Sequence, residues 1–427
     1  MKLQDRLHRL RHDAGCAAGP ARSVTPGSGA VASAELSVTE ALDARLRRTA
    51  TQRASARPAT RGASPAALAT ALGAIEVSPG LLLKQYTYAF ESRAAVDPSA
   101  LPELAAVPQR DWVYCDTETT GLSGGVGTLA FMVGVARFVA VGRVEVRQYV
   151  LCSPAAEAEM LRQVIDWIGA DAVLVSYNGK CFDVPLLLSR LALCRVRSAL
   201  ADLPQLDLMY TVRRACRRFW PDCRLQTAER RLLGRVREDD MPGAEAPEAW
   251  RRWLRGGDDL GLRGVLRHNA LDVESLVALH HRMAQVYAGG DDTGVDYTAI
   301  GRAWWQVDLR HEAVRIWEGA GDRLCERGRL LLAAEYRRRG DWPRAVAIWQ
   351  QLHDAGHAAA SVELAKYHEH RRRDYGTALR YASLGDDAGS DQRCVRLRGR
   401  LDRGRCATPT GAFQLPLLAG SEANAMK

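Results

Sequence analysis

Two acidic residues separated by one position, Asp116 and Glu118, form the part of this sequence best suited to chemistry. They come at the end of the apolar run 112–115, which predicts a buried strand. Because side chains alternate between the two faces of a strand, both carboxylates project to the same side. Neighbouring carboxylates repel each other unless something neutralises them, and a hard divalent cation with oxygen ligands is the usual solution. The pair therefore indicates a metal-dependent active site at a strand end.

Four further residues can complete such a site. Asp183 lies between an expected strand and an expected helix, where helix capping explains it better when it is taken alone. His268 and Asp272 lie one turn apart on an expected helix and share a face, although in isolation an exposed surface pair is the simpler interpretation. Asp207 either joins the site or caps the basic helix that follows it.

Taken together, these residues fit one mechanism. The carboxylates of Asp116, Glu118, Asp183 and Asp272 suit two Mg²⁺ or Mn²⁺ ions about 4 Å apart at a scissile phosphate. His268 would orient or deprotonate the attacking water, a role that suits a side chain titrating near neutral pH. The expected catalytic set is therefore the four acids and His268, with the four acids as metal ligands.

Three segments, 116–122, 177–183 and 268–272, resemble in this order the three exonuclease motifs of the DEDD superfamily, which has a ribonuclease H-like fold. The YprB-like branch of that fold is the nearest resemblance. It is carried by the Gly-rich continuation after Leu122, by Asp207-Leu208, by Glu229 within 225–234, by Asp240-Met241-Pro242-Gly243 and by His268-Asn269.

The resemblance covers about residues 112–279 and implies a hydrolase, a 3′–5′ exonuclease of the DEDD type. It implies that Asp116, Glu118, Asp183 and Asp272 are metal ligands. One feature departs from the family pattern. His268 stands at the Tyr-x-x-x-Asp spacing of the Tyr-type enzymes, whereas the His-type enzymes place their His one residue earlier.

Substrate contacts are expected on both sides of these motifs. A basic stretch over residues 213–237, with Phe219 and Trp220 inside it, can hold a phosphate backbone and stack a base. A solvated arginine face with both aromatic rings in the core explains the stretch equally well. The residues expected to touch the substrate are Thr119, Asn178, Lys180, Arg217 and Arg218. A loop-holding role for Asn178 and a solvated position for Lys180 are the alternatives.

Composition agrees with a nucleic-acid partner without establishing one. The formal net charge is +9, but nearly all of the positive charge is arginine, as in proteins from GC-rich genomes. Scattered cysteines without a C-x-x-C pair argue against a zinc site. No apolar run approaches the roughly 20 residues that span a bilayer, so no membrane partner and a cytoplasmic location are expected.

The 427 residues divide into five expected parts. They are a disordered basic segment (1–66), a lead-in (67–110), an α/β domain with a ribonuclease H-like mixed sheet flanked by helices (111–290), tetratricopeptide-like helical repeats (298–400) and a flexible tail (401–427). Within the domain, a basic helical stretch is expected over 206–234. The repeats are indicated by similar segments 32 and 33 residues apart, for which a plain helical bundle is the alternative.

The function predicted first is metal-dependent 3′–5′ hydrolysis of single-stranded DNA or RNA ends. A non-catalytic scaffold that binds nucleic acid and recruits a protein partner through its helical repeats is the alternative. An endonuclease specific for a junction or flap would use the same site.

Overall fold

The computed structural model describes residues 64–91, 96–108, 111–121, 127–290, 294–385 and 388–406. Most of the expected disordered segment 1–66 and of the expected tail 401–427 lies outside the described residues, as does the Gly-rich loop at 122–126. The boundaries of the expected domains therefore remain predictions.

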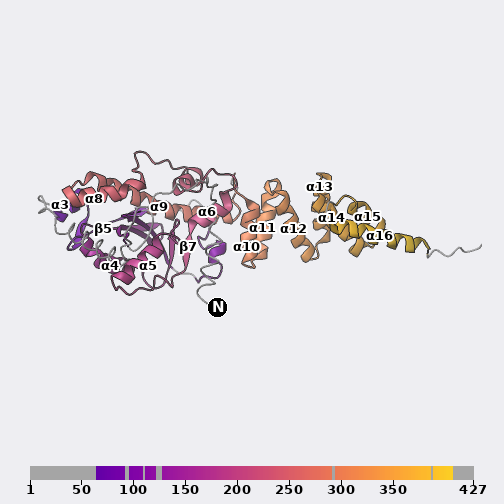
Figure 1. Ribbon diagram of the computed structural model, residues 1–427, viewed down its shortest axis with the longest axis horizontal. Helices are drawn as coiled ribbons and strands as arrows, with labels where there is room; N and C mark the ends of the chain where they lie inside the picture. Colours follow the sequence, from indigo (N-terminus) through magenta and orange to yellow (C-terminus); the bar gives the residue numbers. More distant parts are fainter. Residues whose placement is uncertain are drawn as a thin grey trace, which may run out of the picture. The chain divides into compact units, whose positions relative to one another are not determined.

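The domain contains a mixed sheet, of which β5 and β7 are labelled in Figure 1. The sheet has seven strands in the order β1-β2-β5-β4-β3-β6-β7. The strands β3, β4 and β5 form an antiparallel meander, and β6 and β7 run parallel to β3. The sheet confirms the predicted ribonuclease H-like α/β class. Its strands are β1 (Ile75–Ser78), β2 (Leu81–Ala89), β3 (Asp111–Thr119), β4 (Ala130–Ala140), β5 (Arg143–Leu151), β6 (Ala172–Ser176) and β7 (Gln205–Asp207).

Helices cover both faces of this sheet. Val113 and Cys115 of β3 pack in one core with α4 (Glu157–Ile168) and α5 (Asp183–Leu193). Tyr114 packs in the other core, with α6 (Leu208–Cys216) and the C-terminal half of α9 (Leu260–Tyr287). Burial on both faces explains why the start of β3 is a continuous apolar run. By the same alternation, Asp116 and Glu118 lie on the α9 side.

The expectation of a helical stretch over 206–234 is wrong in the middle. The chain leaves α6 at Cys216 and becomes helical again only at α7 (Leu225–Ala228) and the π-helix η3 (Glu229–Leu233). Pro221 disfavours a helix here because it lacks an N–H and restricts the residue before it. The Asp222 carboxylate then accepts the backbone N–H of Arg224 at 3.0 Å, which fixes the turn before α7.

The remaining elements are mostly helices that pack in sequence order. They are α3 (Pro65–Leu72), η1 (Pro102–Leu104), η2 (Pro154–Ala156), η4 (Gly243–Glu245), α8 (Ala246–Gly256), α10 (Tyr297–Gln306), α11 (Arg310–Ala320), η5 (Gly321–Arg323), α12 (Glu326–Arg338), α13 (Trp342–Asp354), α14 (Ala358–Tyr367), η6 (His368–Arg372), α15 (Tyr375–Ala382) and α16 (Ala388–Cys406). Trp317 and Trp349 are buried, as expected for residues that pack helices together. The tetratricopeptide interpretation of α10–α16 remains a prediction.

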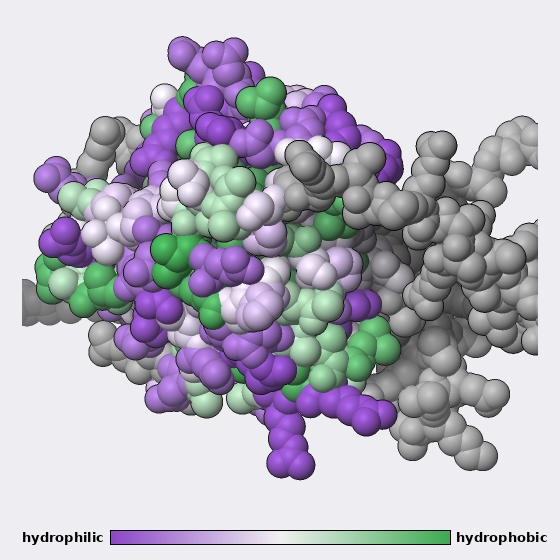
Figure 2. All heavy atoms as spheres, turned by 90° about the vertical axis from the view of Figure 1, so that its left-hand side faces the viewer, coloured by the Kyte–Doolittle hydropathy of each residue, from purple (hydrophilic) through white to green (hydrophobic). Residues whose placement is uncertain are grey.

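Helix hydropathy, one face of the surface and the cysteines can be described for the part of the chain that the structure covers. None of the helices there is long and apolar enough to cross a membrane. The face shown in Figure 2 is mainly hydrophilic, with apolar side chains in small separate patches. Such scattered apolar side chains are normal on a protein surface. The cysteines of the described part, for example Cys115 and Cys216, are free thiols.

Candidate metal centre

Two side-chain amides, from Gln148 of β5 and Asn269 of α9, orient Asp116. Its carboxylate accepts an N–H from the Asn269 side chain at 2.9 Å, and Asn269 in turn accepts an N–H from Gln148 at 2.9 Å. Gly134 of β4 pairs with Asp116 in the sheet, and a Cβ at this glycine would lie 2.1 Å from Asn269 Oδ1. Only a glycine on β4 therefore leaves room for the amide that holds Asp116.

Asp183 opens α5 and is buried beside β3. The hydroxyl of Thr117, which lies between Asp116 and Glu118 in the sequence, donates a hydrogen bond to the Asp183 carboxylate. A Cβ at Gly179 would lie 3.3 Å from Asp183 Oδ2 and 2.3 Å from a side-chain oxygen of β6. The loop before α5 therefore packs tightly against this acid.

Asp207 anchors that loop. Its carboxylate accepts the backbone N–H of Asn178 at 2.8 Å and that of Lys180 at 3.2 Å. The same carboxylate caps α6 through the N–H of Met209 at 3.1 Å. Asn178 has a left-handed backbone with φ 68°. Asp207 thus has the capping role considered from the sequence, and it also ties the loop that carries Asp183 to α6.

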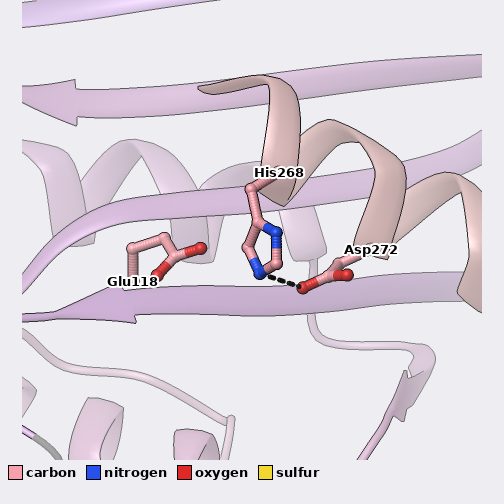
Figure 3. Close-up of side chains that lie close together, drawn as sticks. All are labelled: Glu118, His268 and Asp272. Atoms are coloured by element: carbon pink, nitrogen blue, oxygen red, sulfur yellow. Dashed lines mark ion pairs between the residues drawn. The ribbon is translucent and has the colours of Figure 1, made fainter. Parts of the chain in front are cut away.

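Glu118, His268 and Asp272 meet where β3 passes under α9. One ligand atom from each of these residues lies within 4.8 Å of the others. His268 points from α9 between the two acids, with its Nε2 atom 3.5 Å from Asp272 Oδ2 (Figure 3). The spacing of one helical turn between His268 and Asp272 therefore allows the imidazole to approach both Glu118 and Asp272.

A buried arginine, Arg237, forms an ion pair with Asp272 of this group and with two neighbouring acids. The Arg237 side chain is 7% exposed and donates two hydrogen bonds to Glu229, at 2.7 and 2.5 Å. It also donates to Asp240 at 2.9 Å and to Asp272. Glu229 belongs to the π-helix η3, an irregularity that often marks functional sites. One guanidinium therefore joins η3, the loop after it and α9.

Asp240 also orients the imidazole. Its carboxylate lies 2.8 Å from His268 Nδ1, closer than the 3.4 Å contact of Arg237 with the same atom. Hydrogen bonds from His268 and Arg237 outweigh burial and lower the pKa of Asp240, so this carboxylate is ionised and can only accept. Nδ1 therefore carries the proton, and in the neutral ring Nε2 presents a lone pair toward Glu118 and Asp272.

The pKa values of the four predicted ligands are raised. Burial is the main cause, and the negative charges of neighbouring acids add to it for Asp116 and Glu118. Burial raises the pKa of Asp183 to about 6. For Asp272, burial outweighs the opposing effect of the Arg237 and His268 charges.

The donor set fits divalent cations. Six carboxylates lie here, four from the predicted ligands and two from Glu229 and Asp240, and Arg237 forms ion pairs with three of them. Carboxylate oxygens are the ligands that Mg²⁺ and Mn²⁺ prefer. Two such ions would relieve the repulsion that raises the pKa values of Asp116 and Glu118.

Most of the residues predicted to touch the substrate are exposed. Thr119 donates its hydroxyl to the carbonyl of Gly121 at 2.8 Å. Arg217 and Arg218 are exposed after α6, and Lys180 is exposed in the Asp207-anchored loop. In the described part of the chain, none of these residues forms an ion pair with the predicted metal ligands. Their role as substrate contacts stays a prediction.

Three residues of the site have roles that sequence reasoning missed. The sequence places Arg237 in the basic stretch 213–237, interpreted as either phosphate-binding or solvated, although the acidic residues 238–240 follow it directly. Asn269 lies three residues before Asp272, a spacing that places both on one side of a helix. Asp240 was noted as part of a family segment, but only the fold shows that it contacts His268.

Comparison with known proteins identifies the family. Residues 113–284 match the RNase_H superfamily. The uncharacterized protein YprB of Bacillus subtilis (strain 168) is 32% identical over an alignment of 306 residues that covers 68% of this chain and 73% of YprB. This chain belongs to the YprB-like, ribonuclease H-like family.

The ribonuclease H-like domain supports a nucleic-acid hydrolase. Ribonuclease H-like nucleases generally use divalent metals, which agrees with the cluster of Glu118, His268 and Asp272. Among solved structures, a family B DNA polymerase from the hyperthermophilic archaeon Pyrobaculum calidifontis is similar, with a TM-score of 0.35 and 16% identity. That match covers 54% of this chain and 29% of the polymerase.

Proposed function

We propose that this protein is a metal-dependent 3′–5′ exonuclease that hydrolyses single-stranded ends of DNA or RNA by a two-metal mechanism. The observation that carries the proposal is the approach of Glu118, His268 and Asp272 to within 4.8 Å. Asp183 adds its negative charge to this group, because after burial it is among the acids that raise the pKa of Glu118. Asp116 belongs with them, because after burial Asp272, Asp183 and Glu118 raise its own pKa.

Asp116, Glu118, Asp183 and Asp272 would hold the cations. Divalent ions bound there would acidify a water and offset the charge on the leaving 3′ oxygen. His268 would accept the proton of that water at Nε2, because Asp240 holds the proton on Nδ1. Asn269 and Thr117 would keep the carboxylates of Asp116 and Asp183 in position.

Hydrolysis of end-labelled single strands tests the proposal. Purified protein with Mn²⁺ should shorten a 5′-labelled oligonucleotide stepwise from its 3′ end, and Asp116→Asn should abolish this. Asp166→Asn, an exposed acid on α4, is the matched control and should keep activity. Equal, slow degradation by wild type and Asp116→Asn would refute the proposed chemistry.

A non-catalytic nucleic-acid-binding scaffold is the second candidate. The Arg237 ion pair with Asp272 favours it, because that guanidinium already neutralises one predicted ligand. Titration calorimetry separates the two candidates. If the protein is a scaffold, no Mn²⁺ binding should depend on Asp116 and Glu118. If it is the enzyme, Glu118→Gln should abolish Mn²⁺ binding.

A further inference from the structure

A hollow of about 560 Å³ lies beside the loop that carries Asp183. Its wall includes Tyr177 and Asn178 from the start of that loop, and Arg213, Arg217 and Arg224 from the chain around α6 and α7. We call this surface the arginine hollow. Its volume is in the range of small-ligand sites in proteins.

The arginine hollow carries three arginines and one acid, Asp222. The three arginines are exposed, and none forms an ion pair with another described residue. The acid in its wall, Asp222, already accepts hydrogen bonds from the Arg224 N–H at 3.0 Å and the Thr227 hydroxyl at 2.6 Å. Asp222 interacts electrostatically with Arg224, whereas the guanidinium groups of Arg213 and Arg217 are available to bind an anion from solution.

An apolar side accompanies the charge. Tyr177, Met209 and Leu225 are partly exposed in the wall, and Trp220 lies behind them with little exposure. The Tyr177 hydroxyl donates to the Cys223 carbonyl at 2.6 Å, which holds the ring in place. Cationic groups beside a fixed aromatic ring are the combination that binds single-stranded nucleic acid, through phosphates and unpaired bases.

The hollow is connected to the acidic site by short contacts. Asn178, in its wall, is followed by Gly179, which packs against the Asp183 carboxylate. Asp207 ties this loop to α6, the helix that carries Met209 and Arg213. One rigid unit therefore presents both a predicted metal ligand and the arginine surface.

We propose that the arginine hollow binds the single-stranded part of the substrate adjacent to the end being cut. Arg213 and Arg217 contact phosphates, and an unpaired base packs against Tyr177. The inference rests on the proposed nuclease function and names the surface that holds its substrate. A duplex does not fit this description because its bases are paired and stacked.

Binding of a fluorescein-labelled oligothymidylate, followed by anisotropy in EDTA, tests the inference without hydrolysis. The double variant R213A/R217A should bind about tenfold more weakly. The slope of log binding constant against log salt concentration should become shallower by about one unit, because fewer phosphates are contacted. The control R327A/R339A removes the same charge from exposed positions on and after α12 and should bind like wild type. Equal affinities for the two double variants would overturn the inference.

Two further measurements complete the test. R213K/R217K should recover most of the affinity, because lysine keeps the charge at the phosphates. Polyglutamate should compete much less well than unlabelled oligothymidylate of equal charge, and equal competition would overturn the inference in favour of a general anion surface.

Failure of the inference and failure of the proposed nuclease are distinguishable. If Asp116→Asn does not alter hydrolysis but R213A/R217A weakens binding, the nuclease proposal fails and the strand-binding surface stands. If hydrolysis depends on Asp116 but both double variants bind alike, the arginine hollow alone is refuted.

Discussion

Arg237 is the buried cation on which the charge balance of the acidic site depends. Arg237→Met would leave Glu229 buried without its partner, and we expect unfolding by urea to show a loss of about 3–5 kcal/mol. The double variant E229Q/R237M should lose less than this, because it removes both buried charges. A double variant as unstable as R237M alone would contradict this account.

The Asp240–His268 contact predicts a kinetic effect without a large structural one. Asp240→Asn should lower kcat about 10–100-fold and leave KM nearly unchanged, because Nε2 loses its fixed lone pair. Imidazole ¹⁵N shifts should show the changed tautomer. Asp239→Asn is the matched control, since Asp239 is exposed with φ 51°, a conformation that Asn tolerates. Equal activity of both variants would exclude a positioning role.

The raised acid pKa values predict how stability varies with pH. Burial raises the pKa of Asp183 to about 6, above its unfolded value of about 3.9. The protonated acid therefore favours the folded state below pH 4, and this contribution is lost as pH rises through 6. We expect the stability of wild type relative to Asp183→Asn, without metal, to fall over this interval in urea titrations. Excess Mg²⁺ should reduce the fall, and a rise would contradict the assignment.

At the scale of the elements, Gly134 on β4 is the position that sets the distance between the sheet and α9. Gly134→Ala would place a Cβ 2.1 Å from Asn269 Oδ1, so either α9 or the amide must move. We expect a loss of about 1–3 kcal/mol and weaker Mn²⁺ binding in calorimetry, because Asp116 loses its orienting hydrogen bond. Gly319→Ala, in an exposed helix with open space, should be neutral or slightly stabilising. An unaltered Mn²⁺ affinity in Gly134→Ala would remove Asn269 from the mechanism.

Sequence reasoning succeeded where one local pattern determines an element. The apolar run before Asp116 and the helical spacing around Asp272 predicted β3 and α9, because their buried faces repeat with strand and helix periods. It failed over 206–234, where Pro221 and the Asp222 turn interrupt a basic pattern. Arg237 could not be placed either, since its partners Glu229 and Asp272 lie 8 and 35 residues away in the sequence.

At the scale of the whole described chain, the C-terminal helices share a core with the sheet domain. Tyr287 of α9 lies in one buried cluster with Trp304 and Trp317, and its carbonyl accepts the Trp304 indole N–H at 3.2 Å. The backbone N–H of Asp296 also reaches the carbonyl of Ala215, at the end of α6, at 2.6 Å. The helices α10 and α11 therefore stabilise the domain directly.

This shared core predicts the effect of truncation. A chain ending at residue 290 should lose several kcal/mol and aggregate, because it exposes apolar area around Tyr287 that the full chain buries. A chain ending at residue 387 loses α16, which packs in a separate small cluster, and should keep its melting temperature within a few degrees. Similar melting temperatures for the two truncations would show that the domain is independent of the helices.

The irregular connection between η3 and η4 has some side chains that point inward and others that point to solvent. Arg237 and Asp240 lie inside, while Glu238 and Asp239 between them are exposed. Because the two inward residues are joined to each other by a 2.9 Å ion pair, the outer pair forms a small closed arch. A label on the exposed side chain of Glu238 would leave in place its backbone carbonyl, which accepts a hydrogen bond from Arg267 at 3.1 Å. Such a label would thus report from a position only a few residues from the candidate metal centre.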